Sequence, residues 1–334
     1  MRAMVYDTAG ERFGRLRAVE LPDPEPGPGE VRVRVVVSGV NPTDWKARVV
    51  APGPRPWPEQ VPNQDGAGVI DRVGPGVDPS RVGERVWLHL AAHGHAFGTA
   101  AELVCLPERK AVTLPEGASF DLGAGLGVPA LTAHRCLFAD GDITGRTVLV
   151  TGGGGAVGHM AVQLARHAGA RVITTVSGPE RGAIAATAEP HVTLEYGRED
   201  HVEQLRAAAP TGIDRVVDVD VATNLPAYQD LLNEGAVVAA YAVTEAAPVL
   251  HAPVRALMWR NVVLRFVLLY GVPEAHLDAG ADHVGRLLAD GALLPLPTFR
   301  YPLEELEAAH EHVRAGALGK VLVDVAPPSG GPAS

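Results

Sequence analysis

The chain of 334 residues lacks the features of several special classes of protein. Its two cysteines, Cys105 and Cys136, are too few for a disulfide framework or a four-cysteine zinc lobe, so we expect both to be small buried hydrophobic residues. Its net charge is -10, and no long cluster of lysine and arginine offsets it, which argues against affinity for nucleic acid or an anionic membrane. The most apolar late run, 261–272, contains Arg265 and is far shorter than the about 20 residues that span a bilayer.

The first residues contain no apolar targeting segment of useful length, so we expect a cytoplasmic protein. The length suggests about two domains with ample core.

The stretch 148–165 is the most informative part of the chain, because an apolar strand runs there into a glycine-rich turn that opens an amphipathic helix. Gly153, Gly155 and Gly158 satisfy the pattern G-x-G-x-x-G. The missing Cβ atoms allow a tight turn, close approach of the backbone to a pyrophosphate and close packing of helix on strand. The start of the helix then presents free N–H groups and the positive end of its dipole to phosphates. The pattern predicts a dinucleotide site.

A second strand, 171–176, follows at the distance that a βαβ unit needs, and its end should meet the adenosine ribose. Ser177 can donate a hydrogen bond to a 2′-phosphate and Arg181 can pair with it bidentately, whereas an acid at the strand end would repel it. We therefore expect NADPH. Two alternatives remain: Arg181 is a solvated residue at a helix start, or the adjacent Glu180 binds the ribose of NADH.

The organisation of the chain changes along its length. Residues 1–125 alternate short β-patterned runs with Pro/Gly turns, which predicts an irregular β-rich domain. In 126–272 six strands alternate with helical patterns, which predicts an α/β fold with a doubly wound parallel sheet. The tail 273–334 holds two helical patterns and a final strand, 320–325, that we expect to close on the first domain.

At this point the chain resembles a known family over nearly its full length, the zinc-independent quinone oxidoreductases of the medium-chain dehydrogenase/reductase superfamily. Besides the glycine loop, the matching motifs are GVNPTDWK at 39–46, DGAGVI at 65–70, VGPGV at 73–77, VGERV at 82–86, GTAAELV at 98–104, GVPALTA at 127–133 and GKV at 319–321. The resemblance implies a GroES-like catalytic domain, 1–125 with 273–334, a Rossmann domain, 126–272, NADPH in the cleft between them, and commonly a homodimer.

The resemblance also implies positions for the cofactor. They are Gly155, Ala156 and Val157 at the pyrophosphate, Ser177 and Arg181 at the 2′-phosphate, Tyr196 at the adenosine end, Asn41 and Thr132 near the nicotinamide, and Tyr241 near its ribose. Two of these residues have alternative interpretations. Tyr196 could be partial core at a strand end, and Thr132 could bond its own helix backbone.

In the zinc-dependent relatives, the metal ligands fall at the positions of Asn41 and Gln64. Neither an asparagine nor a glutamine is a competent ligand for catalytic zinc, so we expect no metal. Without a Lewis acid, the easier task is to deliver hydride from NADPH to a quinone or an α,β-unsaturated carbonyl compound. There the negative charge develops on a conjugated oxygen that one or two hydrogen-bond donors can hold.

Asn41, Lys46 and Thr132 are our candidate donors for that oxygen. Lys46 could instead be a surface lysine paired with Asp44. Trp45 is expected either to wall the substrate pocket or simply to pack. Many family members have a tyrosine at the Lys46 position, so this departure argues against a tyrosine-donor mechanism.

Three histidines, His89, His93 and His95, lie close together in a Gly/Ala-rich segment. They lack a fourth metal ligand, so we expect a loop that lines the site, with His93 or His95 as a candidate proton donor near pKa ~6.5. The turn 218–224, DVDVATN, departs from the Gly-Gly turn of many relatives. This departure leaves open, as an alternative function, a biosynthetic enoyl reductase for a particular metabolite. A catalytically idle NADPH sensor is a second alternative, because the intact glycine loop fits both.

Overall fold

The structure, a computed structural model, describes residues 1–9, 14–49, 56–243 and 249–325. The chain divides into unit 1, Met1–Val128 with Ala281–Ser334, and unit 2, Pro129–Gly280. The boundaries that we expected from the sequence, after 125 and before 273, differ from these by three and eight residues.

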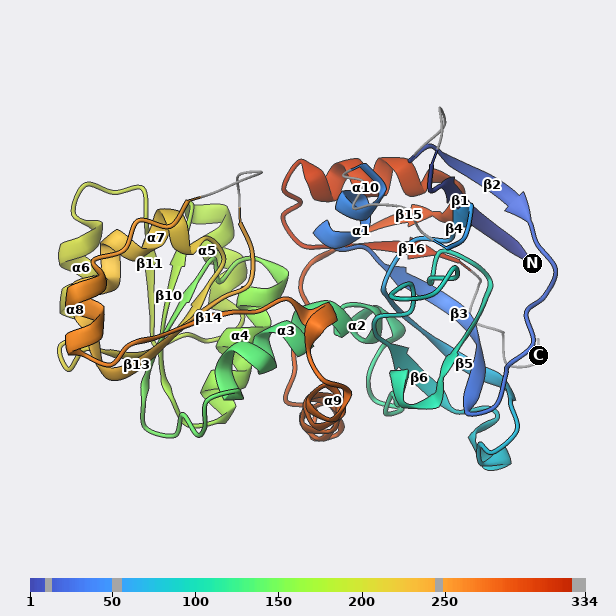
Figure 1. The fold of residues 1–334 in the computed structure, drawn as a ribbon, viewed down its shortest axis with the longest axis horizontal. Helices are drawn as coiled ribbons and strands as arrows, with labels where there is room; N and C mark the ends of the chain where they lie inside the picture. Colours follow the sequence, from blue (N-terminus) through green and yellow to red (C-terminus); the bar gives the residue numbers. More distant parts are fainter. Residues whose placement is uncertain (10–13, 50–55, 244–248, 326–334) are drawn as a thin grey trace. The chain divides into compact units, whose positions relative to one another are not determined.

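Unit 2 is built on a six-stranded sheet whose strands are all parallel (Figure 1). Its strands are β9 (Thr147–Thr151), β10 (Arg171–Val176), β11 (Val192–Glu195), β12 (Ile213–Asp218), β13 (Leu232–Ala240) and β14 (Val263–Phe266). They lie in the order β11-β10-β9-β12-β13-β14. The chain therefore reverses its direction of winding between β9 and β12, and a doubly wound sheet binds its ligand at the carboxyl ends of the strands on either side of such a point.

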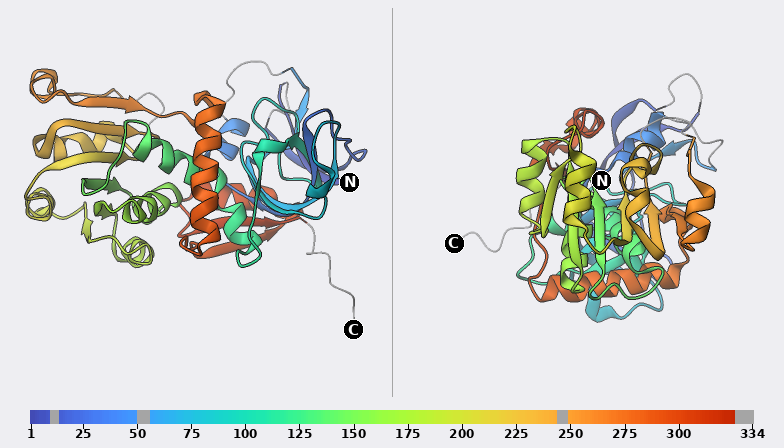
Figure 2. Two further views of the ribbon diagram at one scale, coloured as in Figure 1. Left: turned by 90° about the horizontal axis from the view of Figure 1, so that it is seen from below. Right: turned by 90° about the vertical axis from the view of Figure 1, so that its left-hand side faces the viewer.

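Helices cover both faces of this sheet (Figure 2). The helices that follow the strands are α4 (Ala156–His167), α5 (Pro179–Ala186), α6 (His201–Ala208), α7 (Val221–Tyr228) and α8 (Val254–Trp259); α3 (Gly127–Phe138) precedes the sheet and α9 (Glu274–Ala289) follows it. Leu205 of α6, Leu225 of α7 and Leu257 of α8 share one buried apolar cluster with Leu149 and Val216 of the sheet. The predicted α/β doubly wound fold is confirmed.

Unit 1 is the β-rich part. Its strands are β1 (Arg2–Asp7), β2 (Leu16–Glu20), β3 (Glu30–Gly39), β4 (Glu59–Gln60), β5 (Asp65–Val73), β6 (Arg85–Leu88), β7 (Leu103–Pro107), β8 (Ala111–Thr113), β15 (Thr298–Pro302) and β16 (Lys320–Asp324); its helices are α1 (Pro42–Val49), α2 (Phe120–Ala124) and α10 (Leu306–Arg314). One sheet has the order β15-β16-β3-β5-β6-β8, with β7 also paired to β3, and a smaller one has the order β2-β1-β4.

The last strand closes unit 1, as expected from the sequence. β16 pairs antiparallel with β3, and Leu322 lies opposite Gly39. A Cβ atom on Gly39 would lie 2.0 Å from the carbonyl oxygen of Ala124 in α2, so this close approach of strand and helix requires glycine. The carboxyl-terminal strand thus contributes to the same sheet as residues near position 40.

A buried histidine joins α4 to the end of α5. His159 is fully buried, its Nε2 lies 2.8 Å from Thr187 Oγ1, and its Nδ1 lies 3.0 Å from Gln163 Nε2. Burial lowers the pKa of His159 to about 4, because the imidazolium would lose its hydration there.

We expect this histidine to make stability depend on pH. Its folded pKa lies below its unfolded value, so the unfolded chain takes up a proton first and stability falls as the pH is lowered from about 6.5 towards 4. When the pH is lowered from about 7 to about 5, the free energy of unfolding, measured by thermal unfolding, should fall by about 2 kcal/mol more for the wild type than for His159→Gln. His167→Gln changes an exposed histidine on the same helix and should behave like the wild type. Equal pH dependence in all three proteins would contradict the expectation.

Candidate functional site

The glycine loop after β9 has no room for a side chain at several of its positions. A Cβ atom on Gly153 would lie 2.1 Å from Thr174 Oγ1, and one on Gly158 would lie 2.2 Å from the carbonyl oxygen of Gly152. Gly152 itself has φ of 75°, a backbone conformation that favours glycine. Each contact brings the loop against β10 or the first turn of α4, which is the close packing that the spacing predicts.

The loop leaves the start of α4 open. The helix begins at Ala156, and its N-cap is Gly155, which has no side chain to accept from the first N–H groups. Ala156 and Val157, in the first turn, are partly exposed. Gly152 lies beside Val219, which follows β12, so the loop sits where the winding of the sheet reverses. Uncapped N–H groups at this point fit the pyrophosphate of a nicotinamide dinucleotide.

Arg181 lies against the loop. Its Nη1 donates to the carbonyl oxygen of Gly154 at 3.0 Å, and a Cβ on Gly154 would lie 2.6 Å from the Arg181 carbonyl. Burial lowers the pKa of Arg181, with Tyr196 opposing the shift, so the guanidinium is incompletely hydrated. Ser177, which follows β10, and Glu180 are exposed. The cation thus adjoins the loop, whereas the nearby acid lies in solvent.

The two predicted tyrosines differ in exposure. Tyr196 is 53% exposed, and its backbone N–H donates to the carbonyl of Val176, which places it beside the end of β10 rather than in the core. Tyr241 is partly buried, and its backbone N–H donates to the carbonyl of Asp218. Burial raises the pKa of Tyr241, so its hydroxyl keeps its proton.

The turn after β12 is organised by a buried carboxylate. Asp218 accepts hydrogen bonds from Thr151 Oγ1, Asn224 Nδ2 and the backbone N–H of Asp220 at 2.8–3.0 Å, and from the Tyr228 hydroxyl at 2.5 Å. Sequence reasoning noticed the departure at 218–224 and assigned Asp218 no role. The short spacing of Asp218, Asp220 and Asn224 is the signal that could have indicated a side-chain-supported turn.

In unit 1, Asn41 is part of a buried polar cluster. It is 2% exposed, its Nδ2 donates to Asp65 Oδ2 at 2.6 Å, and its Oδ1 accepts from Lys320 Nζ at 2.7 Å. Lys320 also donates to the carbonyl of Val40 at 3.1 Å, and both carboxyl oxygens of Asp65 accept from the backbone N–H of Val128 at 2.9 Å. The amide thus lies between a buried cation and a buried acid that also caps α3.

A second carboxyl group belongs to the same cluster. Asp44 accepts from the backbone N–H groups of Asn41 at 2.7 Å and Gln64 at 3.1 Å. Burial raises the pKa of Asp44 to about 8 and that of Asp65 to about 6; Asp65 adds to the shift of Asp44, while Lys320 opposes both. Sequence reasoning missed Asp65 and Lys320, although a lysine that opens the apolar strand GKVLVDV is a visible signal.

Lys46 is exposed on α1, and its pairing with Asp44, the alternative interpretation from the sequence, is absent. The Asp44 carboxyl group is buried and faces backbone N–H groups instead. The Lys46 ammonium lies 5.8 Å from the centre of the Trp45 ring, and the Arg314 guanidinium lies 5.6 Å from it. Both distances are typical of cation–π contacts. Thr132, on α3, is 5% exposed.

The three histidines have different surroundings. His89 is buried, and burial lowers its pKa to about 3, so it stays neutral. His93 is exposed, and the Nδ1 of His95 accepts from the backbone N–H of Phe97 at 3.2 Å. Across the part of the chain that the structure describes, no three His, Cys, Asp or Glu side chains are grouped so that they could hold a metal ion.

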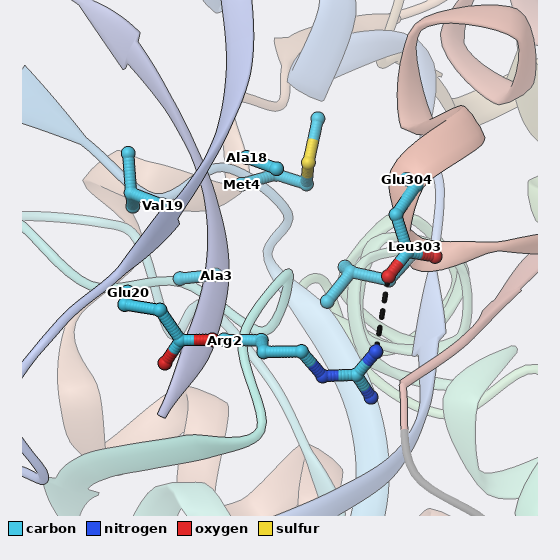
Figure 3. Close-up of a pocket in the computed structure, with 8 residues that line it drawn as sticks. All are labelled: Arg2, Ala3, Met4, Ala18, Val19, Glu20, Leu303 and Glu304. Atoms are coloured by element: carbon cyan, nitrogen blue, oxygen red, sulfur yellow. Dashed lines mark hydrogen bonds and ion pairs between the residues drawn. The ribbon is translucent and has the colours of Figure 1, made fainter.

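A surface hollow of about 200 Å³ lies elsewhere in unit 1, between β1, β2 and the turn that follows β15 (Figure 3). Arg2, at its edge, pairs with Glu304 at 3.0 Å and with Glu102 at 2.8 Å. The hollow contains none of the predicted site residues, and its arginine is already paired with acids. We therefore assign it no role in the site.

Comparison with known proteins identifies the class. Residues 27–116 match the family model of the alcohol dehydrogenase GroES-like domain, and residues 156–281 match that of the zinc-binding dehydrogenases. A solved NAD-dependent alcohol dehydrogenase superposes with a TM-score of 0.85 at 27% identity, covering 98% of this chain and 100% of that chain. The fold and both domains are those of a medium-chain dehydrogenase/reductase, with the GroES-like β-rich domain that the resemblance implied.

Similar proteins indicate the family within this class. Human quinone oxidoreductase is 28% identical over 97% of each chain, and the human synaptic vesicle membrane protein VAT-1 homolog is 30% identical over 79% of this chain and 70% of that protein. A mycobacterial quinone oxidoreductase has a TM-score of 0.81 at 28% identity, covering 97% and 99% of the two chains. The chain belongs to the quinone oxidoreductase family, and it is an NAD(P)-dependent oxidoreductase. None of its described helices is long and apolar enough to cross a membrane.

Proposed function

We propose that the protein is an NADPH-dependent reductase that passes hydride to a quinone or an α,β-unsaturated carbonyl compound without zinc. The observation that carries the proposal is the state of Asn41. Its position corresponds to a zinc ligand in zinc-dependent relatives, and here its amide oxygen accepts from the Lys320 ammonium. A divalent cation bound to this oxygen would be repelled by the Lys320 ammonium, whose nitrogen lies 2.7 Å from the oxygen.

The rest of the donor set also fits zinc poorly. Gln64, at the other corresponding position, offers a neutral amide whose Oε1 is buried without a hydrogen-bond partner, and catalytic zinc prefers thiolate, imidazole and carboxylate ligands. The nearby acids, Asp44 and Asp65, accept from backbone N–H groups and Asn41. The reaction that we propose therefore uses no metal.

The proposed reaction needs few groups from the protein. The reduced nicotinamide, when bound, supplies the hydride. A conjugated carbonyl is already polarised, so the protein has to orient the acceptor and donate hydrogen bonds to the oxygen on which negative charge develops. Our candidates are the Asn41 amide, the Lys46 ammonium and the Thr132 hydroxyl. Trp45 and His93 are candidates for contact with the substrate, and His93, being exposed, could exchange a proton with solvent.

We expect the loss of one donor to slow the reaction without weakening NADPH binding. Asn41→Ala and Lys46→Ala should each lower kcat by about 10- to 100-fold, the usual cost of removing a donor to a developing oxyanion. NADPH oxidation with 1,4-benzoquinone and with 2-cyclohexen-1-one measures the rate. Deuteride from labelled NADPH should appear on the β-carbon of the enone.

The controls separate this function from the alternatives. Arg206→Ala, an exposed cation on α6, should leave the rate unchanged, and a metal chelator should not reduce it. Efficient oxidation of simple alcohols, or activity lost to chelator and restored by zinc, would contradict the proposal. Tight NADPH binding with no turnover of either acceptor would favour the sensor or an enoyl reductase for one particular metabolite.

The preference for NADPH rests on Arg181 and on the absence of an acid at the end of β10. The Arg181 guanidinium lies beside the glycine loop and is incompletely hydrated, so a phosphate that accepts two hydrogen bonds from it would be bound favourably. The nearby exposed hydroxyl of Ser177 can add one hydrogen bond.

Arg181→Ala should remove most of this preference. One charge-assisted contact is worth about 1.5–3 kcal/mol, so NADPH affinity should fall by about 10- to 100-fold while NADH affinity stays nearly unchanged. Titration of both cofactors by fluorescence measures the two Kd values. Glu180→Ala is the matched control: if Glu180 binds the ribose, NADH affinity falls in that variant instead. Equal affinities in the wild type would refute the preference.

We also propose a homodimer formed at the β14 edge of the unit 2 sheet. β14 ends the strand order, and exposed apolar side chains gather around it, including Trp259 at 81%, Met258 and Phe266 at 70% each, and Leu268 at 69%. An unpaired, apolar edge strand is a template for a second strand, and two copies related by a two-fold axis would continue the sheet.

Phe266→Asp should therefore shift the protein from dimer to monomer, because it places a charge in the apolar edge. Sedimentation velocity over a range of concentrations measures the change. Val202→Asp, an exposed apolar position on α6, is the control and should leave the mass unaltered. A wild type that sediments as a monomer at all concentrations would overturn this proposal.

A further inference from the structure

Lys320 is a buried cation at the start of β16. The residue is only 4% exposed, and its ammonium donates to the carbonyl of Val40 at 3.1 Å and to Asn41 Oδ1 at 2.7 Å. A buried ammonium without compensation is costly. Burial lowers the pKa of Lys320, and the nearby acids Asp65 and, after it, Asp44 oppose that shift.

The chemistry of these neighbours allows one orientation of the Asn41 amide. An ammonium can only donate and an ionised carboxylate can only accept. The amide oxygen therefore faces Lys320, and the amide nitrogen faces Asp65 at 2.6 Å. A flipped amide would place its N–H groups against the ammonium and its oxygen against the carboxylate, which are two repulsive contacts.

Both partners of the amide are themselves held in place. Asp65 begins β5 and accepts from the backbone N–H of Val128 through both carboxyl oxygens, so it cannot swing away from the start of α3 without leaving that N–H unpaired. Lys320 is anchored through Val40, the residue before Asn41. The backbone of Asn41 is held as well, because its N–H donates to Asp44 at 2.7 Å.

We propose that Lys320 and Asp65 are positioning residues that clamp the Asn41 amide, so that the second N–H of its nitrogen is presented as a donor to the reacting oxygen. This inference rests on the proposed function. Asp65 accepts a hydrogen bond from one of the two amide N–H groups. The clamp prevents a flip of the amide that would place its oxygen where the other N–H group now lies. Neither Lys320 nor Asp65 contacts substrate in this scheme. Their effect on the reaction passes through Asn41.

Lys320→Met removes the donor and keeps the aliphatic length. It should lower kcat with 1,4-benzoquinone or 2-cyclohexen-1-one by at least about 10-fold, while the KM of the acceptor and the Kd of NADPH change by less than about threefold. Lys320→Arg, which keeps a buried donor and charge, should retain most of the rate. Asp324→Asn, at the exposed end of the same strand, is the control and should match the wild type.

A double-mutant cycle decides whether Lys320 acts through Asn41. If it does, Lys320→Met costs less than about twofold in kcat when Asn41 is already alanine. Independent, multiplicative losses overturn the proposal. So does a Lys320→Met variant in which only KM changes, or a Lys320→Arg variant as slow as Lys320→Met.

Lys320→Met leaves two buried acids without their cation and could fail to fold. The wild type then supplies the test. In protein labelled with ¹⁵N-asparagine, the Asn41 side chain, identified by its loss in Asn41→Ser, should show one amide proton, the one that donates to Asp65, that exchanges slowly with water. An Asn41 amide whose two protons both exchange rapidly with water overturns the clamp itself. A wild type that reduces neither acceptor overturns the proposed function instead.

Discussion

The buried charge cluster around Lys320 is the interaction on which unit 1 depends. One ammonium donates to the Asn41 amide and interacts electrostatically with two buried acids, and these groups come from β16, from the start of α1 and from the start of β5. Removing any one of these groups would leave another buried charge or amide without its partner. The loss of stability would then exceed the net contribution of the intact interaction. The cluster therefore connects the end of the chain to residues near position 41, alongside the pairing of β16 with β3.

In the function that we propose, the same cluster also holds the amide that donates to the substrate. In a zinc-dependent relative, the position of Asn41 supplies a metal ligand. Here a lysine supplies the positive charge, and the acids that surround it accept from backbone N–H groups and from the amide. The two arrangements differ in what they can do to a substrate. A metal polarises a carbonyl or an alcohol directly, whereas a clamped amide can only donate to an oxygen that is already polarised.

Unit 2 depends on a different constraint, which is the absence of side chains in the glycine loop after β9. A Cβ on Gly153 would lie 2.1 Å from the side chain of Thr174, and one on Gly158 would lie 2.2 Å from the backbone of Gly152. This packing places the open end of α4 where the winding of the sheet reverses, and it brings Arg181 onto the loop. The buried carboxylate of Asp218 holds the turn on the other side of that point.

Much of this could be predicted from the sequence. The glycine spacing and the apolar strand before it determined the βαβ unit, because a loop without Cβ atoms and a period-3.6 stripe are local properties. β10 begins and ends where the pattern predicts. The register shift between β12 and β13 near Ile213 has no local signal, because such an irregularity depends on the partner strand. Asn41 was recognised by its position. Only the tertiary structure decided that Lys320 and Asp65 hold its amide and that Asp44 faces backbone rather than Lys46. Lys320 reaches Asn41 across 279 positions through the pairing of β16 with β3, and no local pattern indicates such a contact.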